Sequence, residues 1–164
     1  MLCAIGPWRG AEMMRRAAAF ARAGDELVLL HVIDAGPRHD LDRLRGPLHA
    51  HHERHAELDR AEEEAGRAGL AEAAAEAARV GLAATERLER GRPEEIIVAV
   101  AAEAKVDLVV LFARESPQAH PRQGPPSVGR TARFVLDHAP AAALLLREQG
   151  GLDENRPRHA PPPP

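Results

Sequence analysis

The hydrophobic residues of this chain are concentrated in five short runs, separated by longer stretches in which apolar residues recur with helical spacing. The runs occupy residues 1–5, 26–33, 82–88, 106–112 and 141–146. Four of them are apolar without alternation, as expected of parallel strands that helices cover on both faces. The run at 82–88 alternates imperfectly, and its position fits an edge strand.

Helices are predicted in the stretches between these runs, at residues 11–23, 48–80, 93–105 and 127–139. Pro93 suits the first position of the third helix, and Glu94 and Glu95 complement its positive end. Ser127 can cap the fourth helix, and Pro140 stops it.

The second helix contains two glycines that conflict with its alanine-rich composition. Gly66 and Gly69 each cost ~1 kcal/mol relative to alanine in a helix interior, so we expect a kink or break there. Helical spacing also predicts which residues face inward. In the second helix these are Leu58, Ala61, Ala65 and Ala68, and in the fourth they are Val128, Ala132, Val135 and Leu136.

Five strands alternating with four helical segments predict an α/β fold, a three-layer sandwich around a five-stranded parallel sheet. At 164 residues the chain is long enough for one domain with a sizeable core. We expect that domain at residues 1–148. The tail at 149–164 is rich in proline, glycine and charge, so it buries too little apolar surface to order, and we expect it to be disordered.

The amino-acid composition limits the kinds of molecule that this protein can bind and the cellular compartment in which it is expected. With one Trp, three Phe and no Tyr the chain offers little aromatic surface for stacking bases, and its net charge of -3 comes without a one-sided basic block. Both features argue against nucleic acid as a partner. No apolar run approaches the ~20 residues that cross a bilayer, so we expect no membrane span. The single cysteine, Cys3, cannot form an internal disulfide, which favours a reduced, cytoplasmic setting.

A family resemblance rests on the C-terminal part of the chain, where residues 129–147 read GRTARFVLDHAPAAALLLR. This run resembles the C-terminal signature of the universal stress protein family, in which a glycine opens a helix that ends in His-Ala-Pro before the last strand. The resemblance covers roughly residues 1–148. It implies the adenine nucleotide alpha hydrolase-like strand order 3-2-1-4-5, with the ligand crevice at the carboxyl ends of strands one and four.

The resemblance also implies how the protein acts. In the resembled family two last strands pair antiparallel across a two-fold axis, so we expect a homodimer through Ala143, Leu144, Leu145 and Leu146. No dinucleotide fingerprint, P-loop or nucleophile elbow occurs in the sequence, which leaves no candidate catalytic residue. We therefore expect a non-enzymatic, cytoplasmic stress-response protein that acts through an unknown protein partner.

The nucleotide motif of the resembled family is degenerate in this chain. Nucleotide-binding members have an Asp after the first strand, a Gly-x-x-Gly turn after the fourth, and Gly-Ser or Gly-Thr at the last helix. Gly6 stands at the Asp position, and Phe112 and Glu115 stand at the two Gly positions. Thirteen residues rather than nine separate Glu115 from Gly129. Because Phe112 would obstruct the approach of the backbone and Glu115 would repel phosphate, we expect no cofactor and no tight binding of ATP.

The alternative is a module that senses a nucleotide or another anion. Amides at a helix start attract anions, and glycine permits close approach. Thr131 could replace the missing hydroxyl, and arginines of the long loop and the last helix could attract the anion. The candidate nucleotide- or anion-binding residues are Gly6, Val32, Arg114, Gly129, Arg130 and Thr131.

A histidine cluster in the second helix is a candidate metal site. His51 and His55 lie at i and i+4, a spacing that can chelate a divalent metal. No cysteine is nearby, and the charged residues around the histidines are typical of an exposed helical face. We therefore expect no bound metal.

Overall fold

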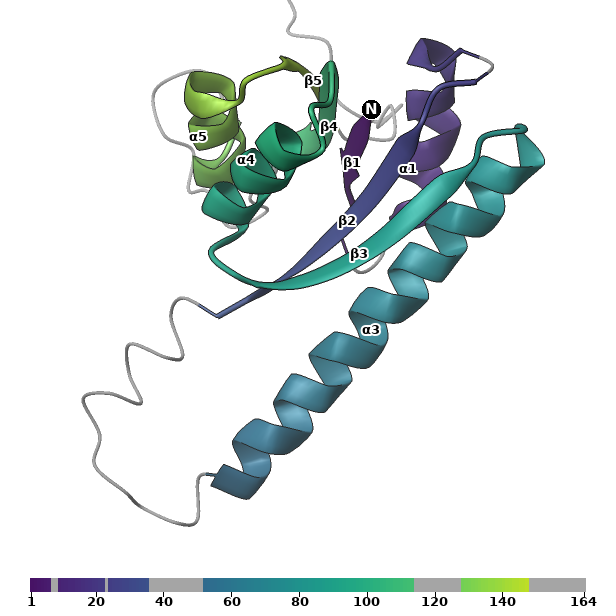
Figure 1. Cartoon of the computed structure of the whole chain (residues 1–164). Coiled ribbons are helices and arrows are strands. Elements are labelled where there is room, and N and C mark those ends of the chain that lie inside the picture. The colour runs from purple at the N-terminus through teal and green to yellow at the C-terminus, as the bar shows by residue number, and fades with distance from the viewer. Residues whose placement is uncertain (7–8, 23, 36–51, 114–127, 148–164) are drawn as a thin grey trace, which may run out of the picture.

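The fold is a five-stranded parallel sheet with helices on both faces (Figure 1). The computed structural model describes residues 1–6, 9–22, 24–35, 52–113 and 128–147. The strands are β1 (Leu2–Ala4), β2 (Leu27–Asp34), β3 (Ala84–Gly91), β4 (Leu108–Ala113) and β5 (Ala142–Arg147). The helices are α1 (Gly10–Ala17), the 3-10 helix η1 (Ala18–Phe20), α3 (His52–Arg79), α4 (Pro93–Glu103) and α5 (Arg130–His138). The order β3-β2-β1-β4-β5, with every neighbouring pair parallel, confirms the predicted fold class.

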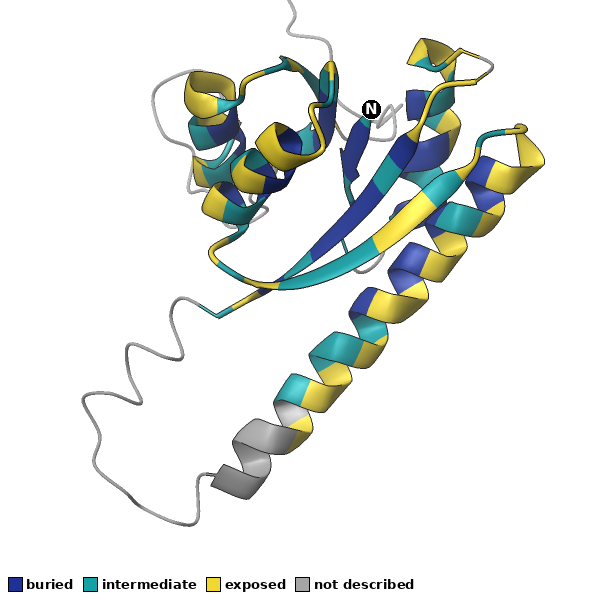
Figure 2. Ribbon diagram, in the orientation of Figure 1, coloured by how far each residue is buried: buried dark blue, intermediate teal, exposed yellow. Residues whose placement is uncertain are grey.

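Two hydrophobic layers flank the sheet, because its central strands are apolar on both faces (Figure 2). Adjacent residues of one strand enter opposite layers, which is why the strands read as unbroken apolar runs. The layer shared with α1 and α3 includes Cys3, Leu29, Val110, Met14 and Leu70. The layer shared with α4 and α5 includes Leu2, Leu30, Val109, Ile97 and Val135.

The long helix α3 runs unbroken through Gly66 and Gly69, so the predicted kink or break is wrong. A Cβ at Gly66 would collide with the His31 ring of β2, and a Cβ at Gly10 of α1 would collide with the Gly69 carbonyl oxygen. The glycines therefore let α3 lie close to β2 and α1. The resulting contacts offset the propensity cost of glycine in a helix.

The buried face of α3 also differs from the predicted stripe. Ala61 and Ala68 are exposed and Ala65 is half-buried, while the side chain of Leu58 lies outside the described residues. Alanines are spread along α3 among its charged residues, so their spacing does not mark the face that meets the sheet. The residues that are buried are Gly66, Gly69, Leu70, Ala73, Glu76 and Ala77. Neither α3 nor any other helix in the described ranges is long and apolar enough to cross a membrane.

Some predicted boundaries and inward positions are wrong by a few residues. The first helix does not reach Gly24, because the backbone is already extended at Ala21. The strand expected at 82–88 is β3, Ala84–Gly91. Leu136 of α5, expected to face inward, is 48% exposed. The predicted tail at 149–164 lies outside the described residues.

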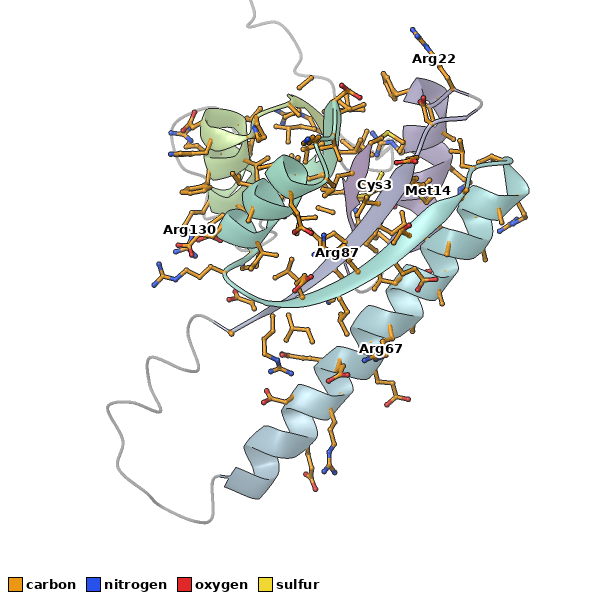
Figure 3. The ribbon with its side chains drawn as sticks, viewed as in Figure 1. Cys3, Met14, Arg22, Arg67, Arg87 and Arg130 are labelled. Atoms are coloured by element: carbon orange, nitrogen blue, oxygen red, sulfur yellow. The ribbon has the colours of Figure 1, made fainter. Side chains whose placement is uncertain are left out.

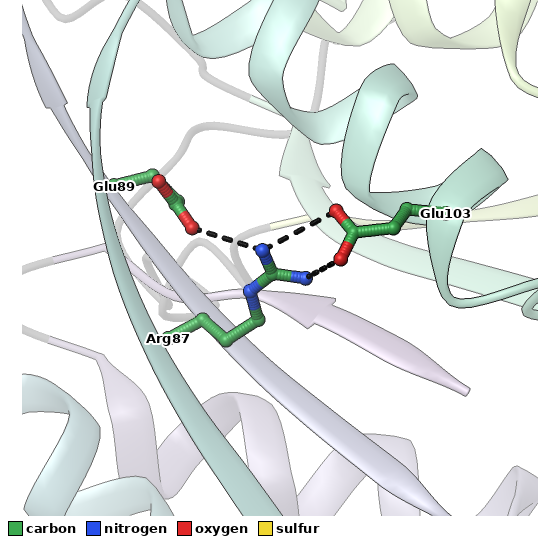
Figure 4. A network of polar contacts seen from close by, with 3 residues as sticks. All are labelled: Arg87, Glu89 and Glu103. Carbon is green, nitrogen blue, oxygen red and sulfur yellow. Dashed lines mark hydrogen bonds and ion pairs between the residues drawn. The ribbon is translucent and has the colours of Figure 1, made fainter.

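The two edge strands differ in charge. Arg87 of β3 donates to Glu89 of the same strand over 3.1 Å and to Glu103 of α4 over 3.2 Å (Figure 4). By contrast, β5 is apolar from Ala142 to Leu146, and its one charged residue, Arg147, is the last. Charged side chains on an edge strand discourage pairing with another sheet. Of the two edges, β5 is therefore the one suited to such pairing.

Candidate functional site

The site predicted from the sequence lies at the carboxyl edge of the sheet, between β1 and β4. The chain leaves β1 for α1 on one face, and it leaves β4 for α5 on the other. Such a divergence is where open α/β sheets bind ligands. Gly6 follows β1 directly, and Gly129 precedes α5. Arg114 and Glu115, which follow β4, lie outside the described residues.

The turn after β1 is held by a buried histidine that sequence analysis did not single out. His31 of β2 is 7% exposed, and its Nδ1–H donates to the Ile5 carbonyl oxygen over 2.8 Å. The Ile5 amide donates in turn to the Leu30 carbonyl oxygen over 2.7 Å. These two bonds fix the backbone next to Gly6. The sequence did carry a signal for His31, because it is a polar residue inside an otherwise apolar strand. A buried polar side chain must find a hydrogen-bond partner.

Gly6 itself has room around it. A Cβ built there meets nothing within 4 Å. The Cβ of an Asp, the residue of nucleotide-binding family members, would therefore meet no steric conflict at this position. The glycine is not required by packing on the described residues.

Phe112, at the end of β4, belongs to the layer of α1 and α3. Arg9 and Arg16 each place the guanidinium carbon 5.6 Å from the centroid of its ring. Arg16 also donates to the Arg147 carbonyl oxygen over 2.6 Å. The Phe112 ring therefore lies on the face of the sheet that α1 and α3 cover, whereas α5 covers the opposite face. Arg9 and Arg16 gave no sequence signal, since they meet Phe112 only through the fold.

The start of α5 is shaped by Gly129, whose φ of 89° lies in the left-handed region that glycine tolerates. Within the described part of the chain no side chain caps this helix end, and the predicted cap, Ser127, lies outside that part. Thr131 is half-buried in the first turn. Helix-start amides and the helix dipole together favour an anion at this end.

A buried carboxylate holds the next residue, Arg130, which projects from the start of α5 (Figure 3). Arg130 Nη2 lies 2.9 Å from Glu94 Oε1, and the two side chains are 81% and 9% exposed respectively. Glu94 Oε2 is buried with no hydrogen-bond partner among the described residues. From the sequence, Glu94 is expected only to complement the positive end of α4. The structure adds that Glu94 links α4 to α5.

The remaining candidates are Val32 and the two histidines. Val32 is half-buried near the end of β2 and packs against the layer of α4 and α5. His51 lies outside the described residues, as does the side chain of His55. The described residues contain no group of three or more His, Cys, Asp or Glu that could hold a metal. Burial raises the pKa of the Cys3 thiol to about 12, so at neutral pH it is protonated and a poor nucleophile.

The residues expected at a dimer contact lie on β5, at the edge of the sheet; they are Ala143, Leu144, Leu145 and Leu146. The Ala142 amide donates to the Asp107 carbonyl oxygen over 3.1 Å, so it faces β4. Amides of successive residues in a strand point to opposite sides. The amides of Ala143 and Leu145 therefore point toward the outer edge, where the described ranges place no further strand.

The comparison with known families decides the identity of this fold. The sequence model of the Universal stress protein family matches residues 1–147 of this chain. The chain belongs to the universal stress protein family. This result confirms the resemblance that residues 129–147 carry.

Solved structures of universal stress proteins share the fold. The protein from Archaeoglobus fulgidus matches with a TM-score of 0.60 at 22% identity, over 88% of this chain and 95% of that chain. The Archaeoglobus fulgidus protein in complex with dAMP matches with a TM-score of 0.57 at 20% identity, over 88% of this chain and 94% of that chain. A family protein from Arabidopsis thaliana with AMP bound matches with a TM-score of 0.56 at 14% identity, over 91% of this chain and 92% of that chain. At these identities the likeness shows the fold alone. A comparison with curated protein sequences gave no match.

Proposed function

We propose that this universal stress protein acts in the stress response as a cytoplasmic homodimer that binds a protein partner, without catalysis and with a degenerate ATP site. The apolar outer edge of β5 is the observation that carries this proposal. An edge strand leaves a row of backbone donors and acceptors that another strand can satisfy. A second copy of β5, antiparallel across a two-fold axis, would supply that strand.

The contrast with β3 supports this assignment. Arg87 and Glu89 lie on the β3 edge and are tied to each other and to α4, so a second strand there would have to accommodate charged side chains. At β5 a second copy would meet Leu144 and Leu145, which are half-buried in the monomer. Burial of their remaining apolar surface would add to the backbone pairing.

Two features support a degenerate ATP site. Gly6 offers no carboxylate for the nucleoside, and Arg130 stands where nucleotide-binding members have a Ser or Thr hydroxyl. The positive charge of Arg130 does not compensate, because Glu94 lies 2.9 Å from it. Calorimetric titration with ATP and Mg²⁺ should therefore give a dissociation constant weaker than about ten micromolar, about -7 kcal/mol.

The dimer can be tested with two substitutions at one position. Leu145→Pro removes an amide that faces the outer edge, whereas Leu145→Ala keeps the amide and removes only side-chain surface. Each backbone hydrogen bond contributes ~1 kcal/mol, and a two-fold interface loses two of them, so the proline should weaken dimerisation ~30-fold. Light scattering at several concentrations measures this. A monomer mass for the unmodified protein at micromolar concentration would refute the dimer.

A second candidate function is nucleotide or anion sensing. It is favoured by the start of α5, where no side chain of the described residues forms a cap, and by Gly6, where a Cβ would meet nothing within 4 Å. Structures that share this fold hold dAMP and AMP. Under this alternative ATP would bind below about ten micromolar, and Gly129→Glu would abolish binding, because it places a carboxylate and a strained φ at the helix start.

A further inference from the structure

We propose that Glu94 sets the affinity of this site for anions: it acts as an internal counter-ion of Arg130 and thereby weakens phosphate binding at the start of α5. The inference rests on the proposed function, in which the nucleotide site is degenerate. It adds Glu94 to the motif changes at Gly6 and Arg130 as a further cause of weak anion binding. Glu94 lies on a different helix from every position of the family's nucleotide motif.

The contact itself removes the attraction that Arg130 would exert. Arg130 is the first residue of α5, so its charge adds to the positive end of that helix. Glu94 Oε1 lies 2.9 Å from Arg130 Nη2, which makes the two side chains a neutral pair. A phosphate that approaches the helix start meets the attraction of Arg130 and the repulsion of Glu94 together. The arginine therefore offers little net gain.

The burial of Glu94 makes this effect persistent. Its side chain is 9% exposed, so solvent screens its charge poorly and the carboxylate cannot turn away into water. Its second oxygen, Oε2, has no hydrogen-bond partner within the described residues. No neighbouring donor on these residues disperses the negative charge of that oxygen. The field of Glu94 therefore acts on Arg130 and on any ligand beside it.

The neighbouring residue Glu95 provides a matched control. It lies in the same first turn of α4 and carries the same charge, but its side chain is 57% exposed and pairs with Arg92 over 3.3 Å. Glu95→Gln and Glu94→Gln change the net charge equally. Any difference between them reports the position of the carboxylate and not the overall charge.

The test is calorimetric titration with AMP, and with adenosine as a ligand that lacks the phosphate. Glu94→Gln should bind AMP about tenfold more tightly than the unmodified protein, a change of ~1.4 kcal/mol. Glu95→Gln should stay within about twofold of the unmodified protein, since an exposed charge is screened. Adenosine should bind equally to all three proteins. Adding Arg130→Gln to Glu94→Gln should remove the gain.

The outcomes separate this inference from the proposed function. Unmodified protein that already binds AMP below about ten micromolar would contradict the degenerate site, and the role of Glu94 with it. Weak binding by the unmodified protein, with equal affinities for Glu94→Gln and Glu95→Gln, would overturn the role of Glu94 alone. Circular dichroism checks folding of each variant. If Glu94→Gln does not fold, Glu94→Ala takes its place, and the same increase in AMP affinity is expected or the inference fails.

Discussion

Replacing Gly66 by alanine should destabilise this protein, although the same change stabilises most helices. Gly66 lies in the interior of α3, where alanine is favoured over glycine by ~1 kcal/mol in the absence of tertiary contacts. An added Cβ would collide with the ring of His31. The tertiary contact and the helix propensity therefore act in opposite directions, and their magnitudes decide the sign.

The tertiary term is the larger of the two. Inserting a methyl group into a well-packed core costs ~1–3 kcal/mol. The His31 ring cannot simply move aside, because its Nδ1–H is bonded to the Ile5 carbonyl oxygen over 2.8 Å. Breaking that bond would leave a buried acceptor unpaired, at a cost of ~1–3 kcal/mol. After the propensity gain is subtracted, the net loss should be ~2 kcal/mol, which lowers Tm by ~4–8 °C in a domain of this size.

A double-mutant cycle measured by urea unfolding isolates the contact. In a His31→Ala background the ring is absent, so Gly66→Ala should become stabilising by up to ~1 kcal/mol. The coupling energy between the two positions should therefore be ~3 kcal/mol. Ala68→Gly, at an exposed position of the same helix, controls for propensity and should cost ~1 kcal/mol. Stabilisation of the unmodified protein by Gly66→Ala, or a coupling energy near zero, would refute this reasoning.

Four further results are expected. The pKa of Cys3 rises from 9.0 to about 12 on folding, so the free energy of unfolding should fall as pH increases between these values, and Cys3→Ala should reduce that fall in urea titrations. Phe112→Leu loses two cation–π contacts and should lower the free energy of unfolding by ~1–2 kcal/mol by the same method. Gly6→Asp should leave Tm unchanged, because a Cβ at this position meets nothing within 4 Å, and the added carboxylate should strengthen adenosine binding in calorimetry. Zn²⁺ should leave Tm unchanged, with or without His51→Ala and His55→Ala; submicromolar Zn²⁺ binding that this double change abolishes would contradict the expectation.

The sequence by itself determined the number, type and approximate limits of the strands. The runs at 106–112 and 141–146 have no polar residue on either side of the strand axis except Asp107, and such a run is stable only between two layers of helices. Pro93 marks the start of α4 because its missing amide is not needed there. These features are local, so they are readable without knowing which elements meet. The motif at 129–147 then identified the family.

The tertiary structure alone decided the roles of Gly66, His31, Phe112 and Glu94. In sequence, Gly66 reads as a helix breaker and Glu94 as a carboxylate that favours the start of a helix. In the fold, Gly66 admits the His31 ring, and Glu94 is buried against an arginine of another helix. The direction in which Phe112 points follows from the pleat of β4 between its neighbours. Hydrophobic periodicity indicates which positions of an element are buried on average. The role of one residue depends on the side chain that it contacts in the fold, and that side chain comes from a distant part of the chain.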